Sequence, residues 1–187
     1  LGTSIYTITD EDAGAVKNDF VITDHSVAND KINLSWDKNG SITSFTAGTS
    51  FNYAGSFNQQ GLNSYWYVPG MNPNEAQTNS FIQVKVLENG PVLVSIVMTS
   101  DAPGANHLEK RITLCKGSNE VMIDNLLDKK AIRQKEAVHF GFPFNASLHK
   151  VTLDAGYGTM QYLADQLPGS NMDFLFGRRW VDLSRQD

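Results

Sequence analysis

Two groups of aromatic side chains in the sequence could bind a ligand. Tyr65, Trp66 and Tyr67 follow one another in a stretch rich in Asn, Gln, Gly and Ser. The second group lies near the C-terminus and mixes rings with ionised groups: Phe174, Phe176, Arg178, Arg179, Trp180 and Asp182. Aromatic rings stack on the apolar faces of sugars, and Arg and Asp hydrogen-bond hydroxyl groups, so both groups are candidates for carbohydrate binding. The alternative is that the rings plug the ends of a β-sandwich.

The Arg178-Arg179 pair is the more informative feature. Consecutive side chains of a strand point to opposite faces, so Arg178 is expected to share a face with Trp180 and Asp182, with Arg179 on the other. One arginine then faces inward, where this residue type is seldom found without a partner. It either pairs with a carboxylate inside the protein or reaches a glycan hydroxyl. Arg178 is the better candidate for a sugar contact, because Trp180 and Asp182 accompany it.

No catalytic or metal-binding motif is present. The sequence contains no Gly-x-Ser-x-Gly, no phosphate-binding Gly-rich loop and no His-Glu-x-x-His. Cys115 is the single cysteine, which excludes a disulfide framework and a Cys-rich zinc site, and its thiol is expected to be buried and inert. The histidines do not have the spacing of metal ligands: His25, His107, His139 and His149. We therefore assign no catalytic residue and no metal ligand.

Local pairs of carboxylates offer a different chemistry. Glu109 with Glu120, or Asp124 with Asp128, could supply the two acids that glycoside hydrolysis needs. Charges on strands are more often solvated, which favours a structural interpretation of these pairs.

The elements that would position these groups are strands. Apolar and polar residues alternate with a period of two, and turn residues recur every 8–12 positions or so, which is typical of an antiparallel sandwich or barrel. About nine or ten strands are expected, among them residues 32–36, 41–45, 81–87, 92–98, 107–115, 121–127, 137–144, 148–153 and 172–183. Residues 48–80 and 156–169 are expected to be long loops, and residues 1–187 to form a single domain.

The same pattern predicts which strands are most buried. Residues 92–98 are apolar on both faces, and Leu108, Ile112 and Leu114 should face inward from their strand. The outward side chains of that strand are then His107, Glu109, Arg111 and Thr113. No helix longer than about three turns is expected.

Composition excludes several classes of function. The chain has 187 residues, 41% hydrophobic and 19% charged, which is typical of a globular domain and argues against disorder. Its net charge is −5 and it has no Lys/Arg run, so it is a poor partner for nucleic acid or an anionic membrane. No apolar run approaches the roughly 18–20 residues of a transmembrane helix. Because the chain starts at Leu1 and shows no signal peptide, we expect it to be a piece of a longer protein.

An ordered series of motifs resembles the large sandwich domain that follows the catalytic domain in family 38 glycoside hydrolases, the α-mannosidases. The resemblance covers about residues 20–187, and the order and spacing of the motifs are similar to those of the family's bacterial members. The motifs are INLSWDKNGSITS (32–44), NSYWYVPG (63–70), VLENGPV (86–92), RITLCKGSNEV (111–121), AVHFGFPF (137–144), DQLPG (165–169) and RRWVDLS (178–184). Each motif is mostly a turn or strand, and it is their order and spacing that carry the resemblance.

The resemblance implies an all-β fold, an antiparallel β supersandwich of the galactose-mutarotase type, in a truncated version that lacks closing strands. It implies that the zinc and the nucleophilic Asp of such an enzyme belong to a preceding α/β barrel, so this chain has no cofactor of its own. The sandwich would pack on that catalytic domain and contribute residues 178–182 to the rim of a pocket for an α-mannoside-like glycan. A bacterial glycan-degrading parent would place it in the periplasm or outside the cell.

Two functions of other classes stay open. One is a stand-alone carbohydrate-binding or scaffold domain that binds glycan through Tyr65, Trp66 and Tyr67. The other is a mutarotase- or lyase-like sugar enzyme on the same fold, with His139 and either Glu136 or Glu109 as acid and base. The sequence upstream of Leu1 would discriminate between them, because only the mannosidase-like parent requires a metal-binding barrel there.

Overall fold

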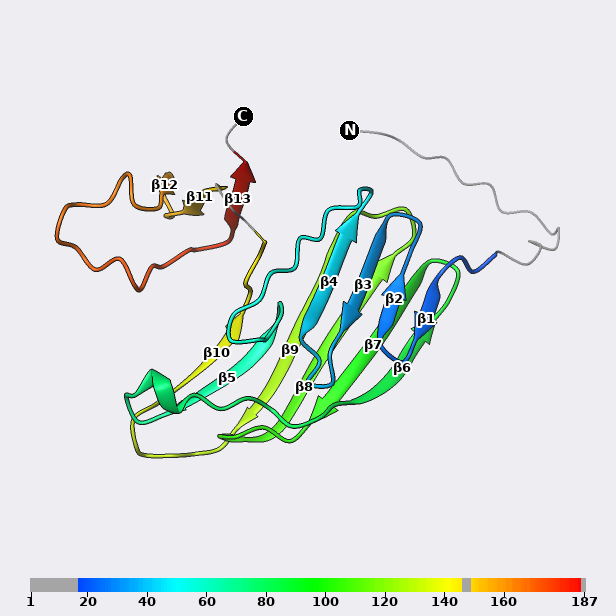
Figure 1. The fold of residues 1–187 in the computed structure, drawn as a ribbon, viewed down its shortest axis with the longest axis horizontal. Coiled ribbons are helices and arrows are strands. Elements are labelled where there is room, and N and C mark those ends of the chain that lie inside the picture. The colour runs from blue at the N-terminus through cyan, green and yellow to red at the C-terminus, as the bar shows by residue number, and fades with distance from the viewer. Residues whose placement is uncertain (1–16, 146–148, 186–187) are drawn as a thin grey trace.

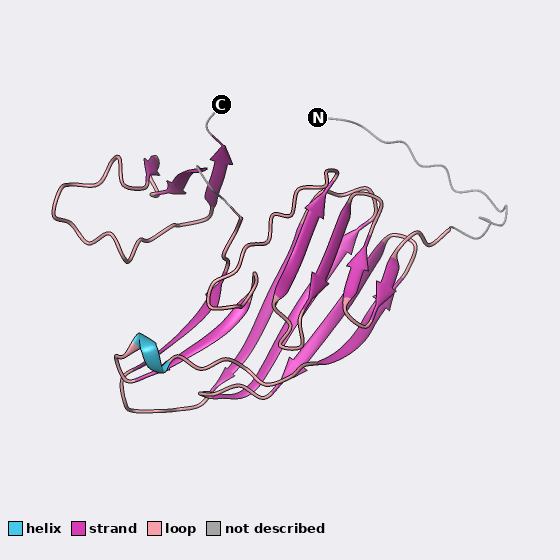
Figure 2. Cartoon of the chain, in the orientation of Figure 1, coloured by secondary structure: helices cyan, strands magenta, loops and turns pink. Residues whose placement is uncertain are grey.

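The computed structural model describes residues 17–145 and 149–185, and these residues form an all-β, antiparallel structure (Figure 1). The only helix among them is a single 3-10 turn, η1 (Pro73–Glu75) (Figure 2). The described residues contain thirteen strands, more than the nine or ten expected, and three of the thirteen are only three residues long. The predicted all-β class is therefore confirmed, and the described residues contain no long helix, as expected.

Two four-stranded sheets face each other. The first has the order β1 (Val21–Thr23), β2 (Ser26–Ala28), β3 (Ile32–Trp36) and β4 (Ile42–Ala47). The second, which lies behind it in Figure 1, has the order β6 (Gln83–Asn89), β7 (Leu93–Ser100), β8 (Ala105–Cys115) and β9 (Val121–Lys129). Side chains from β2, β3, β4, β7 and β8 form the core between them: Val27, Ile32, Leu34, Trp36, Ile42, Val94, Ile96, Met98, Ile112 and Leu114.

A two-stranded sheet continues the structure beside β4 and β9. It pairs β5 (Ser64–Pro69) with β10 (Glu136–Gly141). A second cluster of buried side chains joins it to the β7–β8 turn and β8: Tyr65, Tyr67, Ala102, Ala105 and Leu108. The expected long loop over residues 48–80 is therefore wrong at its centre, because Tyr65 and Tyr67 pack on β8, a contact that no local pattern encodes.

The predicted hairpins occur with their expected turns. In the turn between β3 and β4, the Asp37 carboxylate accepts the N–H groups of Asn39 (2.9 Å) and Ser41 (3.0 Å), and Gly40 has a φ of +72°. The β7 and β8 strands are buried as predicted, with Ile96, Leu108 and Leu114 fully inaccessible. Val92 is an exception, since it precedes β7 and is 66% exposed.

A buried polar cluster interrupts the apolar core. Lys110 occupies the inward position between Leu108 and Ile112 on β8 and is only 1% exposed. Its ammonium donates to the Asn39 carbonyl oxygen at 3.3 Å. The side-chain amide of Asn39 donates to the Asn79 backbone carbonyl (2.7 Å), and that of Asn79 donates to the Asn39 carbonyl (3.0 Å). These two hydrogen bonds connect the β3–β4 turn to residues 79–82.

A small three-stranded sheet forms the C-terminal part. It has the order β12 (Thr159–Gln161), β11 (His149–Asp154) and β13 (Val181–Arg185), and Figure 1 shows it apart from the two large sheets. The strand expected at 148–153 is confirmed from residue 149 on, and Leu148 lies outside the described residues. The strand expected over 172–183 is wrong for most of its length, because the ladder begins only at Val181.

Candidate functional site

The Arg178-Arg179 pair lies at an irregular corner where the chain joins β13. Asp154, the last residue of β11, donates its N–H to the Trp180 carbonyl (3.1 Å) and accepts the Arg178 N–H on its own carbonyl (2.9 Å). Three residues on one strand thus face one residue on the other, which is the arrangement of a β-bulge and re-aims the side chains between. This is the physical reason why residues 178–180 do not alternate as a strand, and why the predicted common face of Arg178, Trp180 and Asp182 is not formed by a regular ladder.

Arg179 is held by a buried carboxylate. Its Nε donates to Asp154 Oδ2 at 2.9 Å, and the Asp154 side chain is only 6% exposed although that of Arg179 is 71% exposed. The second carboxylate oxygen accepts the Gly156 N–H at 2.9 Å. The Gly156 N–H and then Arg179 hold the pKa of Asp154 below its usual 3.8. Asp154 therefore stabilises this corner at pH values above 3.8, and the contribution is lost as the pH falls through its lowered pKa.

Arg178 has a different environment from its neighbour. Its backbone is fixed to Asp154, but its side chain is exposed and makes no hydrogen bond or ion pair with residues 17–145 or 149–185. Trp180, two residues further along the chain, is 43% exposed. Asp182 is exposed and pairs with Thr152 across the β11–β13 ladder. The corner thus separates the two arginines: Arg179 neutralises Asp154, and the exposed Arg178 side chain has no such partner among the described residues.

The same segment exposes large apolar side chains. Phe174 and Phe176, which lead into the corner, are 77% and 82% exposed, and Val181 is 57% exposed. Soluble surfaces seldom concentrate large apolar groups in this way unless something covers them. The segment from Phe174 to Val181 therefore combines an apolar surface with a free guanidinium.

The first aromatic group lies mostly in the core. Tyr65 is fully buried and donates its hydroxyl to the Pro103 carbonyl at 2.5 Å, and its ring meets Phe140 edge to face. Tyr67, 8% exposed, donates to Glu136 Oε2 at 2.7 Å, which raises the pKa of the Tyr67 phenol. Only Trp66 points to the other face of β5, where it is half-buried against Phe57 at 6.1 Å between ring centroids. Of the three, Trp66 alone presents part of its ring to a ligand.

Glu136 is part of a structural contact rather than half of an acid–base pair with His139. It accepts hydrogen bonds from Lys129 and Tyr67, and these two groups hold its pKa below the usual value, with Lys129 the larger cause. His139 lies three positions after Glu136 on β10, so the side chains of Glu136 and His139 point to opposite faces of the strand. His139 pairs with Trp66 across the β5–β10 ladder. The alternative partner, Glu109, is ion-paired with Arg111 at 2.9 Å on β8.

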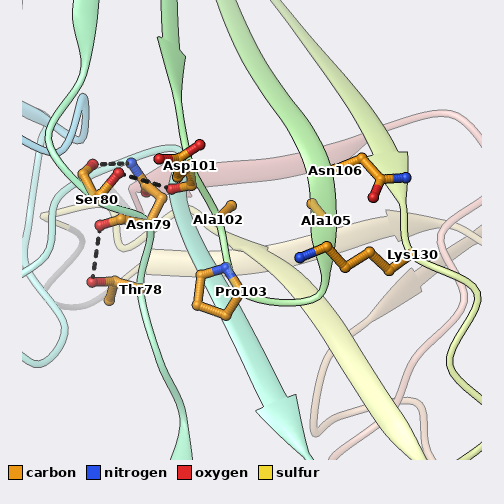
Figure 3. Close-up of a pocket in the computed structure, with 9 residues that line it drawn as sticks. All are labelled: Thr78, Asn79, Ser80, Asp101, Ala102, Pro103, Ala105, Asn106 and Lys130. Carbon is orange, nitrogen blue, oxygen red and sulfur yellow. Dashed lines mark hydrogen bonds between the residues drawn. The ribbon is translucent and has the colours of Figure 1, made fainter.

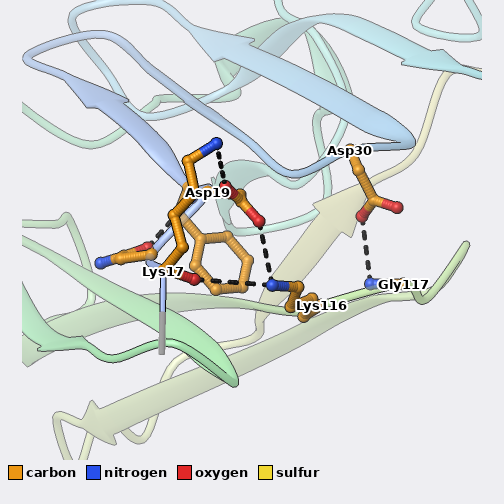
Figure 4. Close-up of polar contacts among 7 residues, drawn as sticks. Lys17, Asp19, Asp30, Lys116 and Gly117 are labelled. Atoms are coloured by element: carbon orange, nitrogen blue, oxygen red, sulfur yellow. Dashed lines mark hydrogen bonds and ion pairs between the residues drawn. The ribbon is translucent and has the colours of Figure 1, made fainter. Parts of the chain in front are cut away.

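The turn after Cys115 is fixed by neighbouring charged groups (Figure 4). The Asp19 carboxylate pairs with Lys17 and Lys116, each at 2.9 Å, and Asp30 accepts the Gly117 N–H at 3.0 Å. Cys115 itself is half-buried, more accessible than the buried thiol that was expected. These contacts pin the β8–β9 turn to the β2–β3 turn and to the residues before β1.

Within the described ranges, no three His, Cys, Asp or Glu side chains lie close enough together to hold a metal ion. In the same ranges, no helix has the length and apolar character needed to span a bilayer. No protein-family model matches the chain, and no curated protein matches it either.

Proposed function

We propose that this chain is the non-catalytic sandwich domain of an α-mannosidase-like glycoside hydrolase. Its antiparallel sheets would belong to a supersandwich of the galactose-mutarotase type. The domain would pack on a catalytic domain of the same protein and contribute to the rim of its carbohydrate pocket. The zinc of such an enzyme would be held by the catalytic domain.

The observation that supports this role is the Asp154 corner. Because Asp154 neutralises Arg179, the neighbouring Arg178 keeps its five N–H donors for another partner. Two residues further along the chain, Trp180 exposes part of its indole, and exposed apolar side chains precede the corner on the same segment. A guanidinium and an indole suit a sugar's hydroxyls and apolar face, and the apolar side chains suit a covering domain.

The test compares Arg178→Ala and Arg179→Ala in the full-length gene product. We expect Arg178→Ala to lower kcat/KM for an aryl α-mannoside by about tenfold to a hundredfold, the loss of one charged hydrogen bond, with an unchanged melting temperature. Arg179→Ala leaves the buried Asp154 with one partner, so we expect it to lower the melting temperature. Arg133→Ala, which removes an exposed arginine without an ion pair among the described residues, is the control for loss of charge.

Two results would argue against this role. One is that Arg178→Ala and Arg133→Ala give the same kcat/KM. The other is that Arg178→Ala and Arg179→Ala both unfold the protein and neither changes the specific activity of what survives.

A further inference from the structure

The end of the sandwich where β7 turns into β8 carries two adjoining hollows. The larger, about 670 Å³, is lined on one side by Thr78, Asn79, Ser80 and Asp101 and on the other by Asn106 and Lys130, with Ala102 and Pro103 between the two sides (Figure 3). The smaller, about 250 Å³, shares Ser80 and Asp101 with it and is lined further by Phe81, Gln83, Thr99, Ser100 and His107. The two hollows meet at Ser80 and Asp101, and polar groups predominate in their lining, with Ala102, Pro103 and Ala105 as apolar members. They lie at the opposite end of the sandwich from the C-terminal sheet (Figure 1).

The groups on this surface are those that recognise sugars. Hydroxyl, amide and carboxylate groups surround one aromatic ring, Phe81, which is 64% exposed. Lys38 lies over that ring, with its Nζ 4.5 Å from the ring centroid, and so helps to hold the ring in place. Ser80 donates its N–H and its hydroxyl to the backbone carbonyl of Asp101. The Asp101 carboxylate makes no hydrogen bond or ion pair with any described residue.

The backbone beneath these groups is fixed from inside the protein. The two reciprocal, buried hydrogen bonds between Asn39 and Asn79 anchor one end of the segment that carries Ser80 and Phe81. The Ser80 N–H donates to the Asp101 carbonyl (2.9 Å), and the Ile82 N–H donates to the Lys38 carbonyl (2.9 Å). A site that is ordered before binding loses less conformational entropy when a ligand arrives.

We infer that this end of the sandwich binds a carbohydrate chain at a site separate from the Asp154 corner. One sugar ring would lie in the smaller hollow against the part of Phe81 that Lys38 does not cover, with its hydroxyls on Asp101 and Gln83. The larger hollow would take the adjoining residues of the glycan. The lining carries one carboxylate, Asp101, and one ammonium, Lys130, so it has no net charge that would select a polyanion. All residues of this site belong to the sandwich itself, so its binding does not require that the chain serve a glycosidase.

The test is a titration of the ¹⁵N-labelled 187-residue chain with mannotriose, maltotriose and xylotriose, followed by amide chemical shifts. We expect at least one of the three sugars to shift the amides of residues 80–83, 99–101 and 107. Phe81→Ala should weaken that binding by about tenfold, since the ring supplies the stacking contact. Asp101→Ala should weaken the binding as well, because the carboxylate that would bind the sugar is lost. The backbone carbonyl that accepts Ser80 is retained in that variant, so the local fold should be unchanged.

Phe51→Ala is the matched control, since Phe51 is an exposed ring (45%) that lines neither hollow. Arg178→Ala should also leave the binding unchanged, which separates this site from the proposed role of the Asp154 corner. The inference is overturned if none of the sugars shifts these amides at about 10 mM, a concentration that detects even millimolar affinity. It is also overturned if Phe81→Ala and Phe51→Ala bind equally well.

Discussion

Replacing Lys110 by Met is expected to raise the free energy of unfolding at pH 7 by about 3 kcal/mol. Burial lowers the pKa of Lys110 from its usual 10.5 to about 8, and nearby Asp37 offsets only part of this effect. Each unit by which the pKa is lowered corresponds to about 1.4 kcal/mol of cost for burying the charged form, and removing the charge is expected to recover this cost. Methionine has a similar length and no charge, and the Asn39 carbonyl keeps its hydrogen bond from Asn79 at 3.0 Å. Urea denaturation of the two proteins measures the difference.

The pH dependence of that difference identifies its cause. Between pH 8 and 10.5 the unfolded chain binds a proton that folded Lys110 has lost, so the stability of the original protein rises with pH relative to the variant. The advantage of Lys110→Met should therefore shrink by most of its value over this range. Lys85→Met, on the exposed strand β6, removes the same charge and should show neither effect. A variant less stable than the original protein at pH 7 would mean that the buried ammonium is a required partner.

Gly61→Ala is expected to lower the free energy of unfolding by more than about 4 kcal/mol. A Cβ atom at this position would lie 2.0 Å from the Ile42 carbonyl oxygen, and a backbone atom cannot move aside as a flexible side chain can. The next residue exchanges two backbone hydrogen bonds with Ile42 (2.8 and 2.9 Å), which connect β4 to the segment that leads into β5. The substitution must break this connection. Thermal and urea denaturation, or loss of the folded amide spectrum, would measure the effect.

Gly158→Ala provides the comparison for this substitution. A Cβ at Gly158 meets no heavy atom within 4 Å, and its φ is not in the left-handed region, so the change should cost little. Equal stabilities of the Gly61→Ala and Gly158→Ala variants would contradict the close approach of Gly61 to Ile42.

Local alternation was enough to predict most of the strands. The pattern from residue 107 to residue 115 places Leu108, Ile112 and Leu114 inward, and these side chains are buried. The same alternation places Lys110 on the inward face, and the structure buries it there although lysine is seldom buried.

Contacts between distant segments could not be predicted in this way. Tyr65 and Tyr67 belong to a strand because they pack against β8 and pair with β10, about 40 and 70 residues further along the chain. The bulge at Asp154 depends on how β11 meets the segment from Arg178 to Trp180, and it decides which arginine has a partner. Phe81 and Asp101 meet only because the β7–β8 turn lies beside the segment before β6.

We propose that this domain serves a zinc-dependent glycosidase and does not catalyse by itself. Hydrolysis of an aryl α-mannoside by the full-length gene product and by the 187-residue chain, each with and without added zinc, tests it most directly. We predict zinc-dependent turnover by the full-length protein and none by the 187-residue chain. Turnover by the pure chain that is abolished by a substitution such as His139→Ala or Glu136→Gln would contradict the claim, and so would a full-length protein with no glycosidase activity.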